Sequence, residues 1–354
     1  MHRPTALRVL VALTLPSTAT LSACATTDPA DAEASADAIQ RFGACEGDFE
    51  ISEPDPMLVW TPSAIELVSE QVSPGVFAVY DSNAASHGPA GIPLATSGGF
   101  VIGSDSVLLV ETMINRQLFC QMIDLVLAET DLPIHYAINT SYHGDHSFGN
   151  AFLPDDVQVV QHEGTAAHIA GYFDEDVAFM SANFGANQGL DEATPVAADI
   201  EVGATPWSVD LGGMTVEARH HGFGQTEGDL FVYVPSAKVM WTGNPLIAEA
   251  PAIPWLLDGH THEVHDTLAA VHDSLPADAI VVPGHGRPLG AQGFDFSLGY
   301  LDALITEVDA AVAVGLSQEQ AVAQVTLDEF QGYALWDWVH VVVNVPVTWT
   351  EAQK

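Results

Sequence analysis

Residues 140–150 read TSYHGDHSFGN and follow directly on a short apolar segment, Ile134 to Asn139. The apolar segment predicts a buried strand, and the polar run after it predicts a loop at the end of that strand. Within four residues of this loop lie two histidines and an aspartate, His143, Asp145 and His146. Imidazole and carboxylate groups are ligands of zinc and similar divalent ions. The loop therefore predicts a metal site at a strand end.

A second segment, far along the chain, carries a histidine in a similar setting. Residues 281–286 read VVPGHG and place His285 at the end of another predicted strand, between glycines that allow close backbone approach. Together with Asp145 and His146 it would give three protein ligands and leave one position open for water, as in catalytic zinc sites. A metal held in this way lowers the pKa of bound water and polarises a carbonyl oxygen, so we expect hydrolysis.

These segments and three others resemble the metallo-β-lactamase superfamily in order and spacing, most closely its broad hydrolase branch. The matching stretches are HGDH at 143–146 with GN at 149–150, PGHG at 283–286, GGFVI at 98–102 with LVET at 109–112, GFGQTEGD at 222–229 and WTGN at 241–244. The resemblance covers roughly residues 72–310. It implies an α/β fold, a four-layer αβ/βα sandwich, with zinc at one edge between the sheets.

The chain departs from the pattern of this family around the first of its two metal sites. Residues of other types stand at four positions: Ser141 and Gln225 for histidines, Asn244 for the aspartate that bridges two metals, and Glu111 for a further aspartate. Of the first-site histidines only His143 is left, whereas the second site keeps Asp145, His146 and His285. The loss of the bridging carboxylate also removes negative charge that would hold two cations close together.

Three interpretations of the altered site remain open. We expect a hydrolase with one zinc on Asp145, His146 and His285, in which Asp145 and the uncoordinated His143 are catalytic; His143 would act as a general base or orient the water. Alternatively, Ser141, Gln225 and Asn244 are weak oxygen ligands and a second zinc binds loosely, with His143 as a metal ligand. In the third interpretation the site has decayed, and the protein is a ligand-binding or scaffold protein. Two histidines and one carboxylate could also hold Fe(II), which ranks below zinc.

The charge of the chain limits its ligands. Eight Lys and Arg against 47 Asp and Glu give a net charge of −39, which excludes nucleic acid because phosphate binding needs a basic face. The same charge would repel a strongly anionic substrate, so a neutral ester, lactone or amide is expected. Arg287 is the best-placed cation to meet an anionic group. His260, before a predicted helix over 262–275, is either a substitute metal ligand or a solvated side chain. No protein partner can be inferred from the sequence.

The N-terminal residues predict export. Arg3 and Arg8 precede a short apolar run, and Leu21 to Cys24 reads LSAC, which resembles the lipobox of bacterial lipoproteins. We expect residues 1–23 to be a lipoprotein signal peptide and Cys24 to carry a membrane lipid anchor on the periplasmic or outer side. An ordinary cleaved signal peptide is the alternative. Residues 24–50 are acidic and poor in large apolar residues, which predicts a flexible tether.

The remaining chain predicts one catalytic domain and an extension. Apolar runs and helical spacing give the order β-β-α-β-α followed by β-β-β-α-β-α over residues 72–315, which favours two sheets with helices outside. One of the helices is predicted over 164–171, ending at Gly171. Residues 316–354 contain enough apolar surface to dock on the domain as a helical extension. Cys45 and Cys120 either form a disulfide or remain apart, since spacing alone does not bring two cysteines together.

Overall fold

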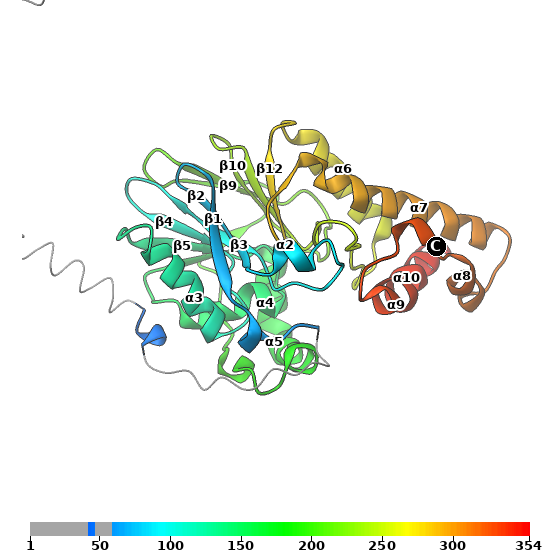
Figure 1. The fold of residues 1–354 in the computed structure, drawn as a ribbon, viewed down its shortest axis with the longest axis horizontal. Helices are drawn as coiled ribbons and strands as arrows, with labels where there is room; N and C mark the ends of the chain where they lie inside the picture. Colours follow the sequence, from blue (N-terminus) through cyan, green and yellow to red (C-terminus); the bar gives the residue numbers. More distant parts are fainter. Residues whose placement is uncertain (1–41, 47–58) are drawn as a thin grey trace, which may run out of the picture.

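The computed structural model describes residues 42–46 and 59–354. Two sheets face each other and helices cover their outer faces, so the expected αβ/βα sandwich is confirmed (Figure 1). The predicted signal peptide, Cys24 and most of the predicted tether lie outside the described residues. Among the residues described, no helix has both the length and the apolar composition needed to cross a membrane.

The first sheet has seven strands in the spatial order β1-β2-β3-β4-β5-β6-β7. Their bounds are β1 Leu67–Ser73, β2 Val76–Asp81, β3 Gly98–Ile102, β4 Val107–Val110, β5 Ile134–Ile138, β6 Gln158–His162 and β7 Ile200–Val202. Strands β1 to β4 pair antiparallel, and β4 to β7 pair parallel. The sequence pattern did not predict β1, because it is a polar edge strand without clear alternation.

The second sheet has six strands in the order β13-β12-β11-β10-β9-β8. Their bounds are β8 Trp207–Asp210, β9 Thr215–Arg219, β10 Phe231–Val234, β11 Val239–Gly243, β12 Ile280–Pro283 and β13 Leu289–Gly290. Only β11 and β12 pair parallel in this sheet, and their carboxyl ends carry Asn244 and His285.

Strand β4 shows how one strand serves two layers. All four of its residues are buried, because alternate side chains point to opposite faces of the sheet and both faces are covered. Leu108 and Val110 pack between the two sheets, against residues such as Val232 and Trp241 of the second sheet. Val107 and Leu109 pack on the other side, under the helices. Because both faces of β4 are covered, its sequence is an unbroken apolar run.

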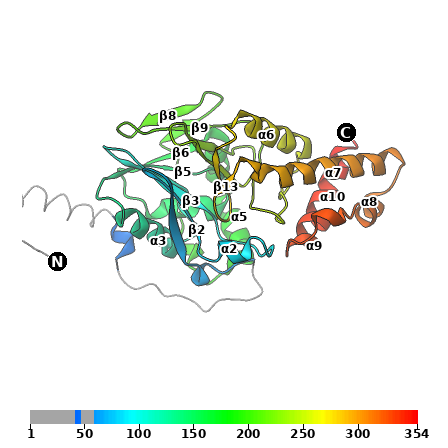
Figure 2. The ribbon, with the colours of Figure 1, turned by 45° about the horizontal axis from the view of Figure 1, so that its top comes forward.

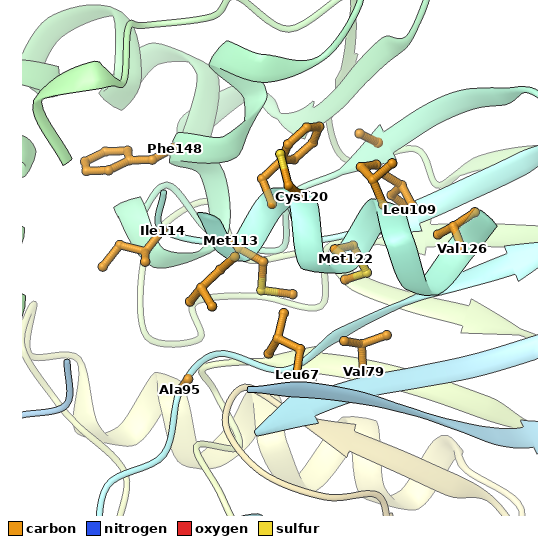
Figure 3. Packing of buried hydrophobic residues seen from close by; sticks show 14 of the residues in the cluster. Leu67, Val79, Ala95, Leu109, Met113, Ile114, Cys120, Met122, Val126 and Phe148 are labelled. Carbon is orange, nitrogen blue, oxygen red and sulfur yellow. The ribbon is translucent and has the colours of Figure 1, made fainter. Parts of the chain in front are cut away.

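Helices α3 (Arg116–Leu127) and α5 (Glu163–Phe184) cover the first sheet. Figure 3 shows Met122 and Val126 of α3 above Leu67 and Val79 of the strands. Two short helices, α2 (Ala84–His87) and α4 (Gly144–Ser147), belong to the same half of the chain.

Helix α5 is much longer than the predicted segment 164–171, and that prediction is wrong about its end. The helix continues through a kink at Tyr172 to Phe184. Past the kink, Phe173, Val177, Met180 and Phe184 recur at helical spacing and pack on the core of this layer. Gly171 is therefore an interior residue, and tertiary packing outweighs its low helix propensity.

Helices α6 (Thr261–Ser274) and α7 (Phe294–Ala313) cover the second sheet. Figures 1 and 2 place the C-terminal helices beside the end of α7 that lies away from the sheets. These are α8 (Gln318–Gln324), α9 (Trp336–Trp338), the π-helical turn η7 (Val339–Asn344) and α10 (Val345–Glu351). Their apolar residues join the core under α6 and α7. The limits of the domain at 72 and 315 stay a prediction, and β1 begins before the first of them.

Residues 42–46 fall within the predicted tether but pack on the body. Phe42 is buried, and Cys45 forms a disulfide with Cys120 of α3. The Cα atoms of the two cysteines are 5.4 Å apart. The disulfide therefore joins the N-terminal segment to the first helical layer.

Reduction of this disulfide is expected to lower the free energy of unfolding by about 2–4 kcal/mol, because a cross-link restricts the unfolded chain. Urea unfolding with and without reductant measures the difference. The double variant Cys45→Ser/Cys120→Ser is the control and should not respond to reductant. Equal stability of the oxidised and reduced protein would contradict the expectation.

Candidate metal centre

The histidine–aspartate loop lies where β5 ends, and α4 begins inside it. His143 has extended backbone angles and is followed by the single turn Gly144–Ser147. A Cβ at position 144 would lie 2.3 Å from the Phe148 ring, so only glycine allows this tight turn. The turn directs the buried side chains of Asp145 and His146 inward.

Asp145, His146 and His285 meet at the edge between the two sheets. Each offers one ligand atom, and these atoms lie within 4.8 Å of one another in buried surroundings. Oδ2 of Asp145 is 3.7 Å from Nε2 of His146 and 3.6 Å from Nε2 of His285. Among the described residues, no other group of three histidine, cysteine or carboxylate side chains converges in this way. The structure thus brings together the three residues that the sequence analysis selected.

Surrounding groups orient the three candidate ligands. Nδ1 of His285 donates to the carbonyl oxygen of Leu94 at 2.9 Å, which leaves Nε2 with a free lone pair facing Asp145. Thr96 donates its hydroxyl proton to Oδ2 of Asp145. Such outer contacts fix the tautomer and direction of metal-binding histidines in metalloproteins. The donor set and its orientation therefore fit a divalent metal.

Glu111 supports His146 from the end of β4. Its Oε1 lies 3.0 Å from Nδ1 of His146. The carboxylate also accepts from the backbone N–H and the hydroxyl of Thr140. Glu111 is buried and has a left-handed φ of 67°. It is therefore placed to support a ligand rather than to bind metal itself.

The buried charges shift the pKa values of the three histidines in different directions. Burial lowers the pKa of both His143 and His285 to about 4. Burial acts in the same sense on His146, but the carboxylates of Asp145 and Glu111 outweigh it and raise that pKa to about 9. Burial raises the pKa of Asp145, and the nearby histidines overcome this and hold it below its usual range. Asp145 is consequently ionised at neutral pH.

Two amides occupy the place of the altered first site. Nε2 of Gln225 donates to the carbonyl oxygen of Trp255 at 3.2 Å, which turns its Oε1 toward Nδ2 of Asn244 at 2.9 Å. Oδ1 of Asn244 then faces Nε2 of His146 at 3.0 Å, while its Nδ2 also lies 3.2 Å from Nδ1 of His143. Because a carbonyl oxygen can only accept, this series of hydrogen bonds has one consistent set of donors. The amides satisfy each other, which favours one metal over two.

Ser141 and His143 complete the loop. Ser141 is fully buried, and its Oγ accepts from the backbone N–H of His143 at 3.3 Å. The ring of His143 faces Asn244 and lines a pocket above the three candidate ligands. Ser141 therefore acts on the backbone of the loop, whereas His143 is directed toward the space that a substrate would occupy.

The pocket has an apolar wall and a polar floor. The pocket is partly open to solvent. His143, Asp145, Asn244 and His285 contribute the polar groups. The rest of the lining is almost entirely apolar. It comes from residues 59–60, the segment 88–94, the end of α5, the segment 247–257 and Tyr333 of the C-terminal extension.

Two residues that the sequence analysis considered lie away from this centre. His260 is half-exposed, pairs with Glu263 at 3.1 Å and stacks on Phe223, so it is not a substitute ligand. Arg287 forms two hydrogen bonds of 2.9 Å with the carboxylate of Glu249 and does not line the pocket. Its charge is already paired, so the expectation that it meets an anionic substrate group is not supported.

Comparison with known proteins agrees with this geometry. Residues 91–285, more than half of the chain, match the family described as the metallo-beta-lactamase superfamily. The chain belongs to the metallo-beta-lactamase superfamily. The matched range includes every candidate ligand from Glu111 to His285.

Solved structures share the metallo-beta-lactamase fold with this chain. A metallo-beta-lactamase from Pontibacter korlensis is 20% identical, with a TM-score of 0.51 over 67% of this chain and 99% of that one. The stereoselective inverting sec-alkylsulfatase Pisa1 from Pseudomonas sp. is 13% identical, with a TM-score of 0.62 over 92% of this chain and 62% of that one. These low identities establish the fold alone.

The sequence analysis missed one contact between the C-terminal extension and this metallo-beta-lactamase site. Asn344, fully buried in η7, accepts from the backbone N–H of Leu256 at 3.1 Å and donates to the carbonyl oxygen of Pro254 at 2.7 Å. It therefore holds the backbone on both sides of Trp255, whose carbonyl oxygen orients Gln225. In the sequence, the only sign of this contact was an asparagine within an apolar stretch.

Asn344→Leu is expected to lower the free energy of unfolding by about 2–4 kcal/mol, because it leaves buried backbone groups at positions 254 and 256 without partners. Chemical denaturation measures this change. Val342→Ala is a matched control, since Val342 lies in the same turn but is 62% exposed. Equal effects of the two substitutions would show that Asn344 does not hold the loop.

Proposed function

We propose that this protein is a metal-dependent hydrolase that cleaves a neutral ester, lactone or amide with one zinc ion. The observation that carries the proposal is the convergence of three buried ligand atoms, from Asp145, His146 and His285, beside an apolar pocket that Asp145 and His285 line. Family membership supports it, because the chain belongs to the metallo-beta-lactamase superfamily.

The metal would be held by Asp145 and by Nε2 of His146 and His285. Its binding would release the proton that Nε2 of His146 donates to Oδ1 of Asn244. When bound there, zinc supplies Lewis acidity and lowers the pKa of water. Asn244 presents Oδ1, a neutral oxygen, to the same place, which is why it remains a candidate contact. A second zinc is disfavoured, because the amides of Gln225 and Asn244 are already hydrogen-bonded to each other.

The residues of the pocket can move the protons that hydrolysis requires. Oδ2 of Asp145 is engaged by Thr96, which leaves Oδ1 to accept a proton from the attacking water. The water oxygen bonds to the carbonyl carbon, the bond to the leaving group breaks, and the proton passes to that group. Products are an acid and an alcohol or amine.

We propose a role for His143 that differs from the expected general base. Burial holds its pKa near 4, so it is neutral at pH 7, and its Nδ1 accepts from Asn244. The proton of the neutral ring is then on Nε2. His143 can therefore donate a hydrogen bond to the carbonyl or leaving-group oxygen of a substrate, and it is a poor acceptor of a proton from water.

The test is hydrolysis of p-nitrophenyl acetate and of a simple lactone before and after removal of metal. Chelation should abolish turnover, and stoichiometric zinc should restore it, whereas Fe(II) under nitrogen should restore less. Turnover that survives complete metal removal would contradict the proposal. Absence of turnover on any ester, lactone or amide by the zinc-loaded protein would favour the alternative, a binding or scaffold protein.

We also propose that the enzyme acts outside the cytoplasm, attached to a membrane through lipid on Cys24. Support comes from the sequence of residues 1–24 alone. Labelling with a radioactive fatty acid tests it, since Cys24→Ser should lose the label and leave the membrane fraction.

A further inference from the structure

The pocket above the candidate metal centre has a pronounced chemical asymmetry. Its polar groups, which include the candidate ligands Asp145 and His285, form the floor. Trp60, Leu94, Met180 and Phe184 form buried apolar walls. A site of this kind recognises a ligand with one polar end and a larger apolar part. The polar floor would bind the reacting group of the ligand, and the apolar walls would bind its larger apolar part.

The rim of the pocket extends the apolar wall into solvent. Six large apolar side chains are exposed among the described residues, and two of them, Ile92 and Phe179, line this pocket. Ile92 is 43% and Phe179 44% exposed. Exposed apolar side chains at the mouth of an apolar pocket mark a binding surface. Phe179 reaches the rim because α5 continues beyond its kink.

Charge sets a second condition on the ligand. No Lys or Arg is among the residues that line the pocket in the described part of the chain, and Arg287 is paired with Glu249. An anionic substrate would find no fixed cation in these walls, and the protein as a whole carries −39.

We propose that the substrate is an uncharged ester or lactone with an aliphatic chain that lies against the end of α5, between Phe179 and the buried walls. This inference rests on the proposed function for the reacting group, but the binding of the chain does not depend on turnover. Hydrolysis would add the water oxygen to the carbonyl carbon, break its bond to the alkoxy oxygen and yield an anionic acid.

The test measures binding of 2-nonanone and 2-butanone, which carry the carbonyl but cannot be hydrolysed, by calorimetry on the full metal-loaded protein. Burial of the five extra methylenes should make 2-nonanone bind at least about tenfold more tightly. Octyl sulfate, of similar chain length but anionic, should bind more weakly than 2-nonanone. Tighter binding of octyl sulfate, or equal binding of the two ketones, would overturn the inference.

Matched variants on α5 test where the aliphatic chain of the ligand binds. Phe179→Asp should weaken binding of 2-nonanone at least about tenfold by removing apolar contact area at the rim. Tyr172→Asp is the control: Tyr172 is 57% exposed on the same helix, does not line the pocket, and should leave binding within twofold. Equal effects would refute the assignment of the rim. Binding without hydrolysis of octanoate esters would refute the proposed function alone, whereas hydrolysis without preference for octanoate over acetate esters would refute this inference alone.

Discussion

Asp145→Asn is expected to lower kcat/KM for ester hydrolysis by about 10³-fold, since a bound metal supplies several kcal/mol of transition-state stabilisation. The substitution keeps the shape of the side chain but removes the only carboxylate among the three candidate ligands. It also removes the group that we propose as proton acceptor. Steady-state kinetics at fixed zinc concentration measure the loss.

A second buried aspartate provides the control for this substitution. Asp81 is buried and accepts from the backbone N–H of Asn83 at 2.8 Å, away from the pocket. Asp81→Asn should affect stability but leave kcat/KM of the folded enzyme within a few-fold. If Asp145→Asn retained most of the activity, neither the metal-binding role nor the proton-accepting role of Asp145 would stand.

Glu111→Gln is expected to weaken zinc affinity about 10–100-fold, the usual effect of removing a group that supports a metal-binding histidine. The carboxylate lies 3.0 Å from Nδ1 of His146 and raises the basicity of that ring. Glutamine can still accept from Thr140, so the local fold should persist. Competition with a chromophoric zinc chelator measures the affinity.

The matched control for this substitution is Glu129→Gln, at an exposed position after α3. It removes the same charge from the protein without touching the centre. An unchanged zinc affinity of Glu111→Gln, or an equal change in both variants, would mean that Glu111 acts only through its hydrogen bonds to the backbone and hydroxyl of Thr140.

The ends of the strands explain why the ligands could be predicted from sequence. Glu111, Asn244 and His285 each follow a buried apolar strand, as does the loop of Asp145. An apolar run that stops at a polar residue is visible in one dimension, and the carboxyl ends of neighbouring parallel strands lie at one edge. The selection of His285 and of the loop of Asp145 therefore needed no knowledge of tertiary contacts, whereas Glu111 and Asn244 were selected through the resemblance to the metallo-β-lactamase superfamily.

Other parts of the site could not be predicted, because their partners are distant in sequence and lack periodicity. Thr96 and the carbonyl of Leu94 lie in an irregular segment, and Leu94 meets His285 across 191 residues. Asn344 reaches Pro254 across 90 residues. Hydrogen bonds to backbone groups carry no signature in the sequence of the partner.

The walls of the pocket were missed for a related reason. Phe179 and Phe184 belong to the part of α5 beyond Gly171, which the sequence pattern had left outside the helix. Tyr333 comes from the C-terminal extension, whose placement beside the pocket depends on packing with α7. Apolar residues in these segments could only be recognised as core or surface, because the space they enclose exists in three dimensions alone.

The central claim is that a single metal binds at Asp145, His146 and His285, and metal content tests it most directly. Elemental analysis of the purified protein, of His285→Ala and of His260→Ala as an exposed histidine control gives zinc per chain. We predict about one equivalent in the wild type and in His260→Ala, and a large loss in His285→Ala. No zinc in the supplemented wild type, two equivalents per chain, or full retention in His285→Ala would contradict the claim.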